Sequence, residues 1–412
     1  MMHLSFKNRY SKPVWIGFFG TCLTSITGAM LAPFFMIYIY EQLHGNVLLS
    51  MAIISLQPLS EIVITIVAGS VTDRYGRKSI ILIGLFIQVI SMAGFIWAHS
   101  AFMLATLYVL NGIGRSLYIP AHRAQIADTT AEKQQSEVFA IINTLYAIGS
   151  SVGPALGYIV YAYNPASIFL FESIALFMYF LVVWIKMPET FPLPIQNKHK
   201  EYTKTKWYQS IWDDYFVIGF MICSLPISFF YAQTETNYRI YLEDLFPNYL
   251  IVLSTLATAK AIITILFQIA LTKWSEAFSM RKLIIITYTV YVVAALSYGY
   301  FANVVILIIM QLFLTIGESV GLNHFLRFVS KLAPVHKRGR YFAIYGTHWD
   351  LSRTIGPVLG GTILLHYGGN ILFYFSALLL ILGGFAQFFF VRHIERQNAQ
   401  NKKMERREEE AF

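Results

Sequence analysis

The sequence predicts an all-α membrane protein in which twelve transmembrane helices form two pseudo-symmetric halves of six helices. Charged residues make up 13% of the chain, against about 25% in typical soluble domains. Hydrophobic residues reach 56% and the mean hydropathy is +0.56, which the surface of a water-soluble protein could not accommodate. Two further observations support this prediction: a regular series of long apolar stretches, and a recurrence of segments of the first half in the second.

The predicted spans are bounded by charged, Gly-rich or Pro-rich segments, and each is close to the roughly 20 residues that cross a bilayer as a helix. In order, they are 14–40, 48–71, 79–98, 102–126, 138–162, 166–186, 214–236, 249–272, 283–301, 304–329, 341–365 and 370–391. The first span follows basic residues as a signal peptide does, but its apolar run exceeds the roughly 7–15 residues of a signal-peptide core. It is therefore predicted to be a helix of the mature protein.

The basic residues predict the orientation of these helices. Nearly all of the 31 Lys and Arg residues fall on the side of the membrane that carries the N-terminus, and Arg239 stands on the other. By the positive-inside rule, both termini are predicted to be cytoplasmic. The net charge of +9 is thus explained by topology, and no nucleic-acid partner is expected.

The predicted organisation has five parts. They are a cytoplasmic N-terminal tail (1–13), an N-terminal six-helix half (14–186), a cytoplasmic linker (187–213), a C-terminal six-helix half (214–392) and a cytoplasmic tail (393–412). The linker is too short to fold independently.

An internal repeat supports the division into two halves. The pattern Gly153-Pro154-x-x-Gly157 in the fifth span returns as Gly356-Pro357-x-x-Gly360 in the eleventh, and further matches keep the same offset. Repeated halves are typical of secondary transporters, whose substrate site lies near the midplane of the membrane.

A basic loop between the second and third spans has a recognisable pattern, in which glycines permit close helix approach and a tight turn, and a carboxylate is placed beside cations. Its defining residues are Gly69, Asp73, Arg74, Gly76, Arg77 and Lys78. This loop resembles the signature of the major facilitator superfamily. The resemblance implies a cytoplasmic gate in which Asp73 bonds near the start of the eleventh span, around residues 339–342.

The fifth span carries a second pattern, with stacked glycines for close helix packing and a proline that permits a kink. It consists of Gly149, Gly153, Pro154 and Gly157. This pattern resembles the drug:proton antiporter branch of the superfamily, although Tyr158 replaces its last glycine. In the fourth span, Tyr108 stands where that branch has an arginine, and Arg115 follows Gly112 by three residues.

Ionisable side chains inside predicted spans are candidates for function, because each costs at least about 2.5 kcal/mol to insert. They are Glu61, Arg115, Glu172, Lys260, Glu318, Asp350 and Arg353. Arg115 and Glu318 occupy equivalent positions in the repeat. We expect Glu318 to titrate during transport and Arg115 to compete with its proton; a static structural pair is the alternative.

A second predicted pair joins Glu61 to Arg353 across the interface between the halves, with Asp350 as a further partner of Arg353. The alternative is an Asp350–Arg353 pair within one helix, with Glu61 protonated. No role is assigned to Glu172 or Lys260.

Aromatic side chains predict a polyspecific cavity wall, since ring faces attract lipophilic cations; ordinary packing is the alternative. The candidates are Tyr118, Tyr146, Tyr231, Tyr345 and Trp349. Cys22 and Cys223 lie in apolar stretches, so neither a disulfide scaffold nor a metal site is expected.

The resemblance implies a proton-coupled secondary transporter that works by alternating access and exports small lipophilic or cationic compounds. Export of lipids or glycolipids and uptake of sugars or metabolites are the alternatives; a membrane-embedded enzyme or sensor is disfavoured, because neither a His/Asp/Glu cluster at a membrane face nor a sizeable soluble domain is found. The expected partners are a small-molecule substrate, protons and the lipid bilayer, and the protein is expected to act as a monomer. A bacterial inner membrane is the expected location, and the proton gradient replaces any cofactor.

Overall fold

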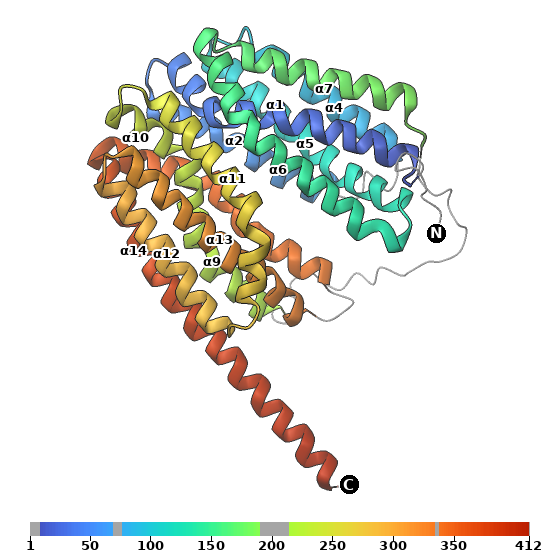
Figure 1. Ribbon diagram of the computed structural model, residues 1–412, viewed down its shortest axis with the longest axis vertical. Helices are drawn as coiled ribbons and strands as arrows, with labels where there is room; N and C mark the ends of the chain where they lie inside the picture. Colours follow the sequence, from blue (N-terminus) through green and yellow to red (C-terminus); the bar gives the residue numbers. More distant parts are fainter. Residues whose placement is uncertain (1–8, 69–75, 190–213, 334–337, 412) are drawn as a thin grey trace. The chain divides into compact units, whose positions relative to one another are not determined.

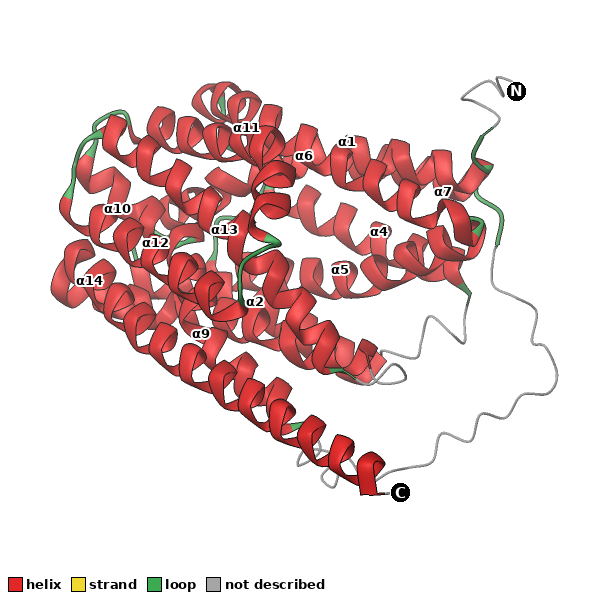
Figure 2. Cartoon of the chain, turned by 60° about the horizontal axis from the view of Figure 1, so that its bottom comes forward, coloured by secondary structure: helices red, strands yellow, loops and turns green. Residues whose placement is uncertain are grey.

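The computed structural model describes residues 9–68, 76–189, 214–333 and 338–411, and this part of the chain is built from α-helices joined by short loops, without strands (Figure 2). The all-helical fold class predicted from the sequence is confirmed. In chain order the helices are α1 (Lys12–Gln42), α2 (Val47–Ala68), α4 (Arg77–Phe95), α5 (Ala101–Thr129), α6 (Glu132–Tyr163), α7 (Ser167–Lys186), α9 (Tyr215–Glu235), α10 (Asn237–Leu245), α11 (Tyr249–Ser275), α12 (Met280–Tyr300), α13 (Val304–Leu332) and α14 (Arg338–Ala411).

Within the described ranges, 11 helices are long and apolar enough to cross a membrane. The last of them, α14, is two helices merged across a break at Gly368, whose φ of 84° is open mainly to glycine. This break separates the eleventh and twelfth predicted spans. The short α10 follows the seventh span and is not itself a span.

Large apolar side chains on the outside of the helices identify the protein as a multi-pass integral membrane protein. Phe102 is 82% exposed and Ile269 is 71% exposed, and many other large apolar side chains are also exposed. Such a surface is costly in water and favourable in a lipid bilayer, where apolar side chains meet acyl chains.

Local capping explains where several helices begin. Asn303 accepts hydrogen bonds from the backbone N–H groups of Val305 and Ile306 at the start of α13, and Ser279 accepts one from Lys282 at the start of α12. The turn between α1 and α2 uses positive φ angles at His44 and Gly45. Each arrangement satisfies backbone groups that a helix end leaves free or reverses the chain tightly.

The described part of the basic loop forms the start of α4. Gly76 has a φ of 86°, as its predicted turn requires. The Glu189 carboxylate accepts hydrogen bonds from the backbone N–H groups of Arg77 (3.0 Å) and Lys78 (3.3 Å). A carboxylate is favoured there by the positive end of the helix dipole. Gly69, Asp73 and Arg74 lie outside the described residues, so the contact predicted for Asp73 stays a prediction.

The described chain packs as two units (Figure 1). Unit 1 contains the described residues of Met1–His199 together with Glu235–Ile262 and Pro357–Thr362. In it, α1 packs extensively against α6, and α4 packs against α5 and α7. Three of the glycines of the fifth span bring α6 close to α1: a Cβ on Gly149 would lie 2.5 Å from Ser25 Oγ, a Cβ on Gly153 would lie 2.6 Å from Ala29 Cβ, and Gly157 faces the carbonyl of Met30.

Unit 2 contains the described residues of Lys200–Thr234, Ile263–Gly356 and Ile363–Phe412, and within it α12 packs against α13.

The two copies of the Gly-Pro pattern make similar bonds in unit 1. The carbonyl of Pro154 accepts from Ser254 Oγ (2.9 Å), and the carbonyl of Pro357 accepts from Asn237 Nδ2 (3.1 Å). The orientation of the termini and the boundaries of the two predicted halves remain predictions.

Replacing Gly153 with Ala is expected to destabilise the protein by about 1–3 kcal/mol, because the new methyl group meets the α1 backbone as well as the side chain of Ala29. Gly346→Ala is the matched control, since no packing atom lies within 4 Å of its Cβ position. It should be neutral or slightly stabilising because alanine favours helix. Thermal unfolding in detergent measures both; equal shifts for the two variants would contradict the close packing of α6 on α1.

Candidate functional site

The first candidate cluster lies in unit 1, between α2 and α5. Arg115 Nε is 2.9 Å from Glu61 Oε1, and the two form an ion pair. Gln57 adds a hydrogen bond to the same carboxylate oxygen (3.2 Å) and another to Asn111 Oδ1 (3.0 Å). The charged pair is thus held by neutral amides from both helices.

Gly112 explains why these two helices can pair their charges. A Cβ at this position would lie 2.7 Å from the carbonyl oxygen of Gln57 and would overlap Ser60 Oγ. The missing side chain lets α5 approach α2 closely, and Arg115 then follows one turn later, within reach of Glu61. The Arg115 side chain is 46% exposed. A half-exposed guanidinium in the middle of a span is expected to face water or another protein group rather than lipid.

The structure shows a partner for Glu61 within its own unit, and the predicted pair with Arg353, which joins the two units, stays a prediction. Glu61 pairs with Arg115 of the adjacent helix in its own unit, because α2 and α5 are packed together at Gly112. The predicted partner Arg353 lies on α14 in unit 2, three residues after Asp350. The predicted relation of Arg115 to Glu318 also joins one unit to the other and stays a prediction.

The second candidate cluster lies in unit 2 and surrounds Glu318 of α13. The Tyr231 hydroxyl of α9 donates a hydrogen bond to Glu318 Oε1, and it lies 3.0 Å from the Tyr291 hydroxyl of α12. The ring of Trp349 on α14 packs edge-on against Tyr231, with centroids 5.3 Å apart. The acidic group is therefore held by the hydroxyl of Tyr231, whose ring belongs to a cluster of aromatic side chains.

Three buried polar side chains from α9 and α14 support the position of Trp349. His348 Nδ1 lies 3.0 Å from Ser228 Oγ, which lies 2.9 Å from Ser352 Oγ. The His348 ring also contacts Trp349, with centroids 5.1 Å apart. These contacts join α9 to α14 and fix the orientation of Trp349.

The predicted cavity-wall residues have different environments. Tyr231 and Trp349 lie together beside Glu318, whereas Tyr345 is buried against Phe220 and His348 inside unit 2. In unit 1, Tyr118 stacks on His122 with centroids 5.1 Å apart, and Tyr146 is 47% exposed.

Three further polar groups were given no functional role from the sequence. The Glu172 carboxyl lies inside unit 1 against α1. Glu41 accepts hydrogen bonds from the hydroxyls of Tyr161 (2.8 Å) and Tyr249 (3.2 Å). Arg239 donates to the carbonyl of Ala32, and burial lowers the pKa of its guanidinium to about 10. A tyrosine in a helix usually serves ordinary packing, so the sequence contained no sign of the bonds that Tyr161 and Tyr249 make with Glu41.

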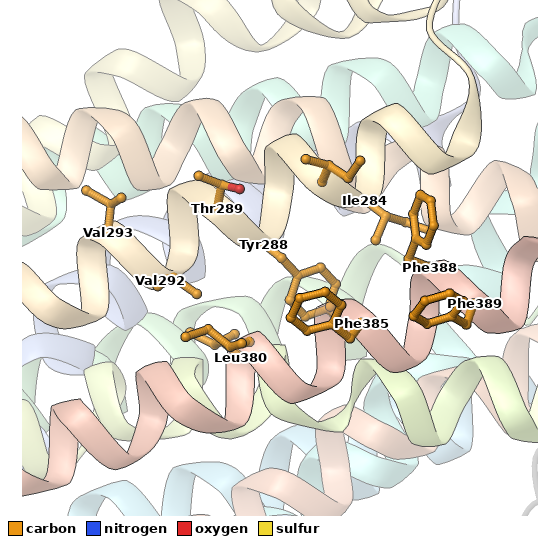
Figure 3. A pocket seen from close by; sticks show the side chains of 12 residues that line it. Ile284, Tyr288, Thr289, Val292, Val293, Leu380, Phe385, Phe388 and Phe389 are labelled. Atoms are coloured by element: carbon orange, nitrogen blue, oxygen red, sulfur yellow. The ribbon is translucent and has the colours of Figure 1, made fainter.

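An apolar groove also lies in unit 2, between α12 and the second part of α14 (Figure 3). Its volume is about 540 Å³, and Tyr288 and Thr289 supply its polar atoms, without a charged side chain in the lining. Figure 3 shows Phe385, Phe388 and Phe389 beside Tyr288 and Ile284. The groove has no charged group that would bind a cation, so the candidate site is assigned to the two charged clusters instead.

The Glu318 cluster has the chemistry of a cation site. An ionised carboxylate supplies the negative charge, and the faces of Tyr and Trp rings attract organic cations. A proton can occupy the same carboxylate, so cation and proton would exclude one another. In the described part of the chain, no group of three or more His, Cys, Asp or Glu side chains is placed to hold a metal ion.

The sequence matches the family model described as Major Facilitator Superfamily over residues 17–247 and 248–411. It is 45% identical over 391 residues to the uncharacterized MFS-type transporter YhjO of Bacillus subtilis (strain 168), covering 95% of this chain and 96% of that protein. It is 24% identical over 332 residues to Multidrug resistance protein 1 of the same organism, covering 79% and 82%. Among solved structures, a D-xylose-proton symporter superposes with a TM-score of 0.73 at 12% identity, covering 92% of this chain and 97% of that one.

Replacing Tyr231 with Phe is expected to cost about 1–3 kcal/mol of stability, because it leaves Glu318 without the hydroxyl that donates to it. Tyr300→Phe is the matched control, since Tyr300 is 73% exposed, and its effect should stay within about 0.5 kcal/mol. Thermal unfolding of the purified variants measures the difference. Equal stability of the two variants would show that the Tyr231 bond does not hold Glu318 in place.

Proposed function

Because this chain belongs to the Major Facilitator Superfamily and is a multi-pass membrane transporter, we propose that it exports small lipophilic cations in exchange for protons. The expected mechanism is alternating access, in which the two halves expose one central site to each side of the membrane in turn. Glu318 carries the exchange: it binds either a proton or the cation.

The observation that carries this proposal is a carboxyl bonded to a tyrosine that belongs to an aromatic cluster. The Tyr231 hydroxyl donates to Glu318 and also lies 3.0 Å from the Tyr291 hydroxyl, and the Tyr231 ring packs against Trp349, so side chains of three helices gather on the residue that holds the carboxyl. Ring faces provide attraction without demanding one substrate shape, at about 0.5–2 kcal/mol for each cation–π contact. A site of this kind favours positive charge and broad specificity over recognition of a polar sugar.

Competition at one carboxyl supplies the coupling. A ligand shifts a conformational equilibrium only by the difference between its affinities for the two states. If the loaded and protonated forms of Glu318 favour opposite accessibilities, proton entry drives cation exit without ATP. The relative named Multidrug resistance protein 1 supports export of this kind.

Energised everted vesicles provide the test. Adding tetraphenylphosphonium to vesicles that contain this protein is expected to dissipate the proton gradient, and Glu318→Gln should reduce this response at least about tenfold, because the amide can neither bind a proton nor attract the cation as a carboxylate does. Glutamine still accepts the hydrogen bond from Tyr231, so the fold should be retained.

Glu276→Gln is the matched control for this experiment. The same chemical change is made at an exposed position between α11 and α12, and the response should equal that of the unmodified protein. An undiminished response in Glu318→Gln would refute the role of Glu318. No response to any lipophilic cation in the unmodified protein would refute this substrate class and favour a lipid, sugar or metabolite.

A further inference from the structure

A second carboxyl, Glu172 of α7, is buried in unit 1. Its Oε2 atom is buried and has no hydrogen-bond partner. Its Oε1 atom lies 4.0 Å from the position of a Cβ on Gly28 of α1, and the Thr27 side chain is its polar neighbour on that helix. An ionised carboxylate in such a position would lack a hydrogen bond at Oε2, so the cost of burying its charge would be only partly compensated.

The cation that acts on Glu172 is Arg115, which is already paired with Glu61 at 2.9 Å. Two carboxylates and one guanidinium leave one uncompensated negative charge, and burying such a charge costs several kcal/mol. Glu61 has both Arg115 and the amide of Gln57 as partners, whereas Glu172 Oε2 has none. A proton on Glu172 removes the excess charge at the lowest cost.

The other helices around α7 offer little competing charge. Along α4, no titratable side chain follows Lys78, and on α1 the titratable side chain nearest in sequence to Gly28 is Cys22, with the carboxyl of Glu41 at the far end of the helix. From α6, the phenol of Tyr146 acts on Tyr179 and not on Glu172. Arg115 is therefore the charged group on which the protonation of Glu172 depends.

A line of ring contacts between polar aromatic side chains leads from this position toward the end of unit 1 that carries Arg77 and Asp128, and the Tyr179 hydroxyl in it is buried without a hydrogen-bond partner. Tyr179 lies two turns beyond Glu172 on α7, and its ring packs edge-on against Tyr118 of α5, with centroids 6.1 Å apart. Tyr118 stacks on His122, whose Nε2 atom is buried without a hydrogen-bond partner. Glycines on α1 make room for these side chains: a Cβ on Gly17 would lie 3.4 Å from His122 Nε2, and the Tyr179 ring occupies the space beside Gly20.

We propose that Glu172 is a proton-binding site of the N-terminal half, that it competes with Glu61 for Arg115, and that the Tyr179–Tyr118–His122 line is its proton route. When Glu172 is protonated, Arg115 pairs with Glu61; when Glu172 loses its proton, it draws Arg115 away. A role for this exchange in transport rests on the proposed proton coupling, but the protonation of Glu172 can be measured without transport.

Infrared spectroscopy of the purified full-length protein in lipid vesicles tests the protonation directly. At neutral pH, where exposed carboxyls are ionised, the unmodified protein is expected to show the carbonyl band of a buried protonated carboxyl, and Glu172→Gln is expected to lose that component. Glu276→Gln should keep it. Persistence of the whole band in Glu172→Gln, or its absence from the unmodified protein, would overturn the proposal.

Glu61→Gln tests the competition in a protein that keeps Glu172. Without Glu61, Arg115 is free to pair with Glu172, and the Glu172 band at neutral pH should fall roughly twofold or more, because a neighbouring cation favours the ionised carboxyl. An unchanged band would overturn the competition for Arg115. In His122→Phe, exchange of this carboxyl proton for deuterium should be slower than in the unmodified protein; equal rates would overturn the proposed route.

These results separate this inference from the proposed function. Loss of the band in Glu172→Gln together with silence toward lipophilic cations would refute only the proposed substrate. A normal response to lipophilic cations together with an unchanged band in Glu172→Gln would refute only the role of Glu172.

Discussion

Ionisable side chains inside an apolar helix bundle must be paired or neutral, and the polar architecture of this protein depends on that constraint. Glu61 is neutralised by Arg115, and Glu318 is held by the hydroxyl of Tyr231. Each arrangement has room for a further charge. The charge of Arg115 also acts on a second carboxyl, that of Glu172. The Glu318 carboxyl is bonded to Tyr231, which packs against Trp349, and the faces of such rings attract cations. A proton or a substrate cation can balance the charge at such places.

Close helix approach makes these pairings possible. In unit 1, Gly112 lets α5 approach α2 closely, so that Arg115 reaches Glu61. Glycine is costly in a helix, by about 1 kcal/mol relative to alanine, and here that cost is offset by side-chain partners that a Cβ would keep apart. The same principle brings α6 against α1 at Gly153.

The sequence predicted the fold well because the length of the apolar stretches and the turn at Gly76 are local signals. Its limits appear where function depends on which faces of two helices meet. The pair of Glu61 with Arg115 was not predicted, although Gly112, which lets α5 approach α2, precedes Arg115 by three residues in the sequence. The bond between Tyr231 and Glu318 joins α9 to α13, and a tyrosine in an aromatic-rich chain gives no sign of a specific partner. Glu172 received no role because the sequence does not show which face of its helix meets α1, the helix toward which its carboxyl points.

The central claim is that a proton and a lipophilic cation compete for Glu318. Calorimetric titration of the purified protein with tetraphenylphosphonium, repeated in buffers that differ in ionisation enthalpy, measures the protons released on binding. The account predicts release approaching one proton per bound cation under conditions in which Glu318 begins protonated, by the linkage of the two equilibria. It also predicts that this release is lost in Glu318→Gln. Binding of equal affinity without proton release over the whole accessible pH range would contradict the account.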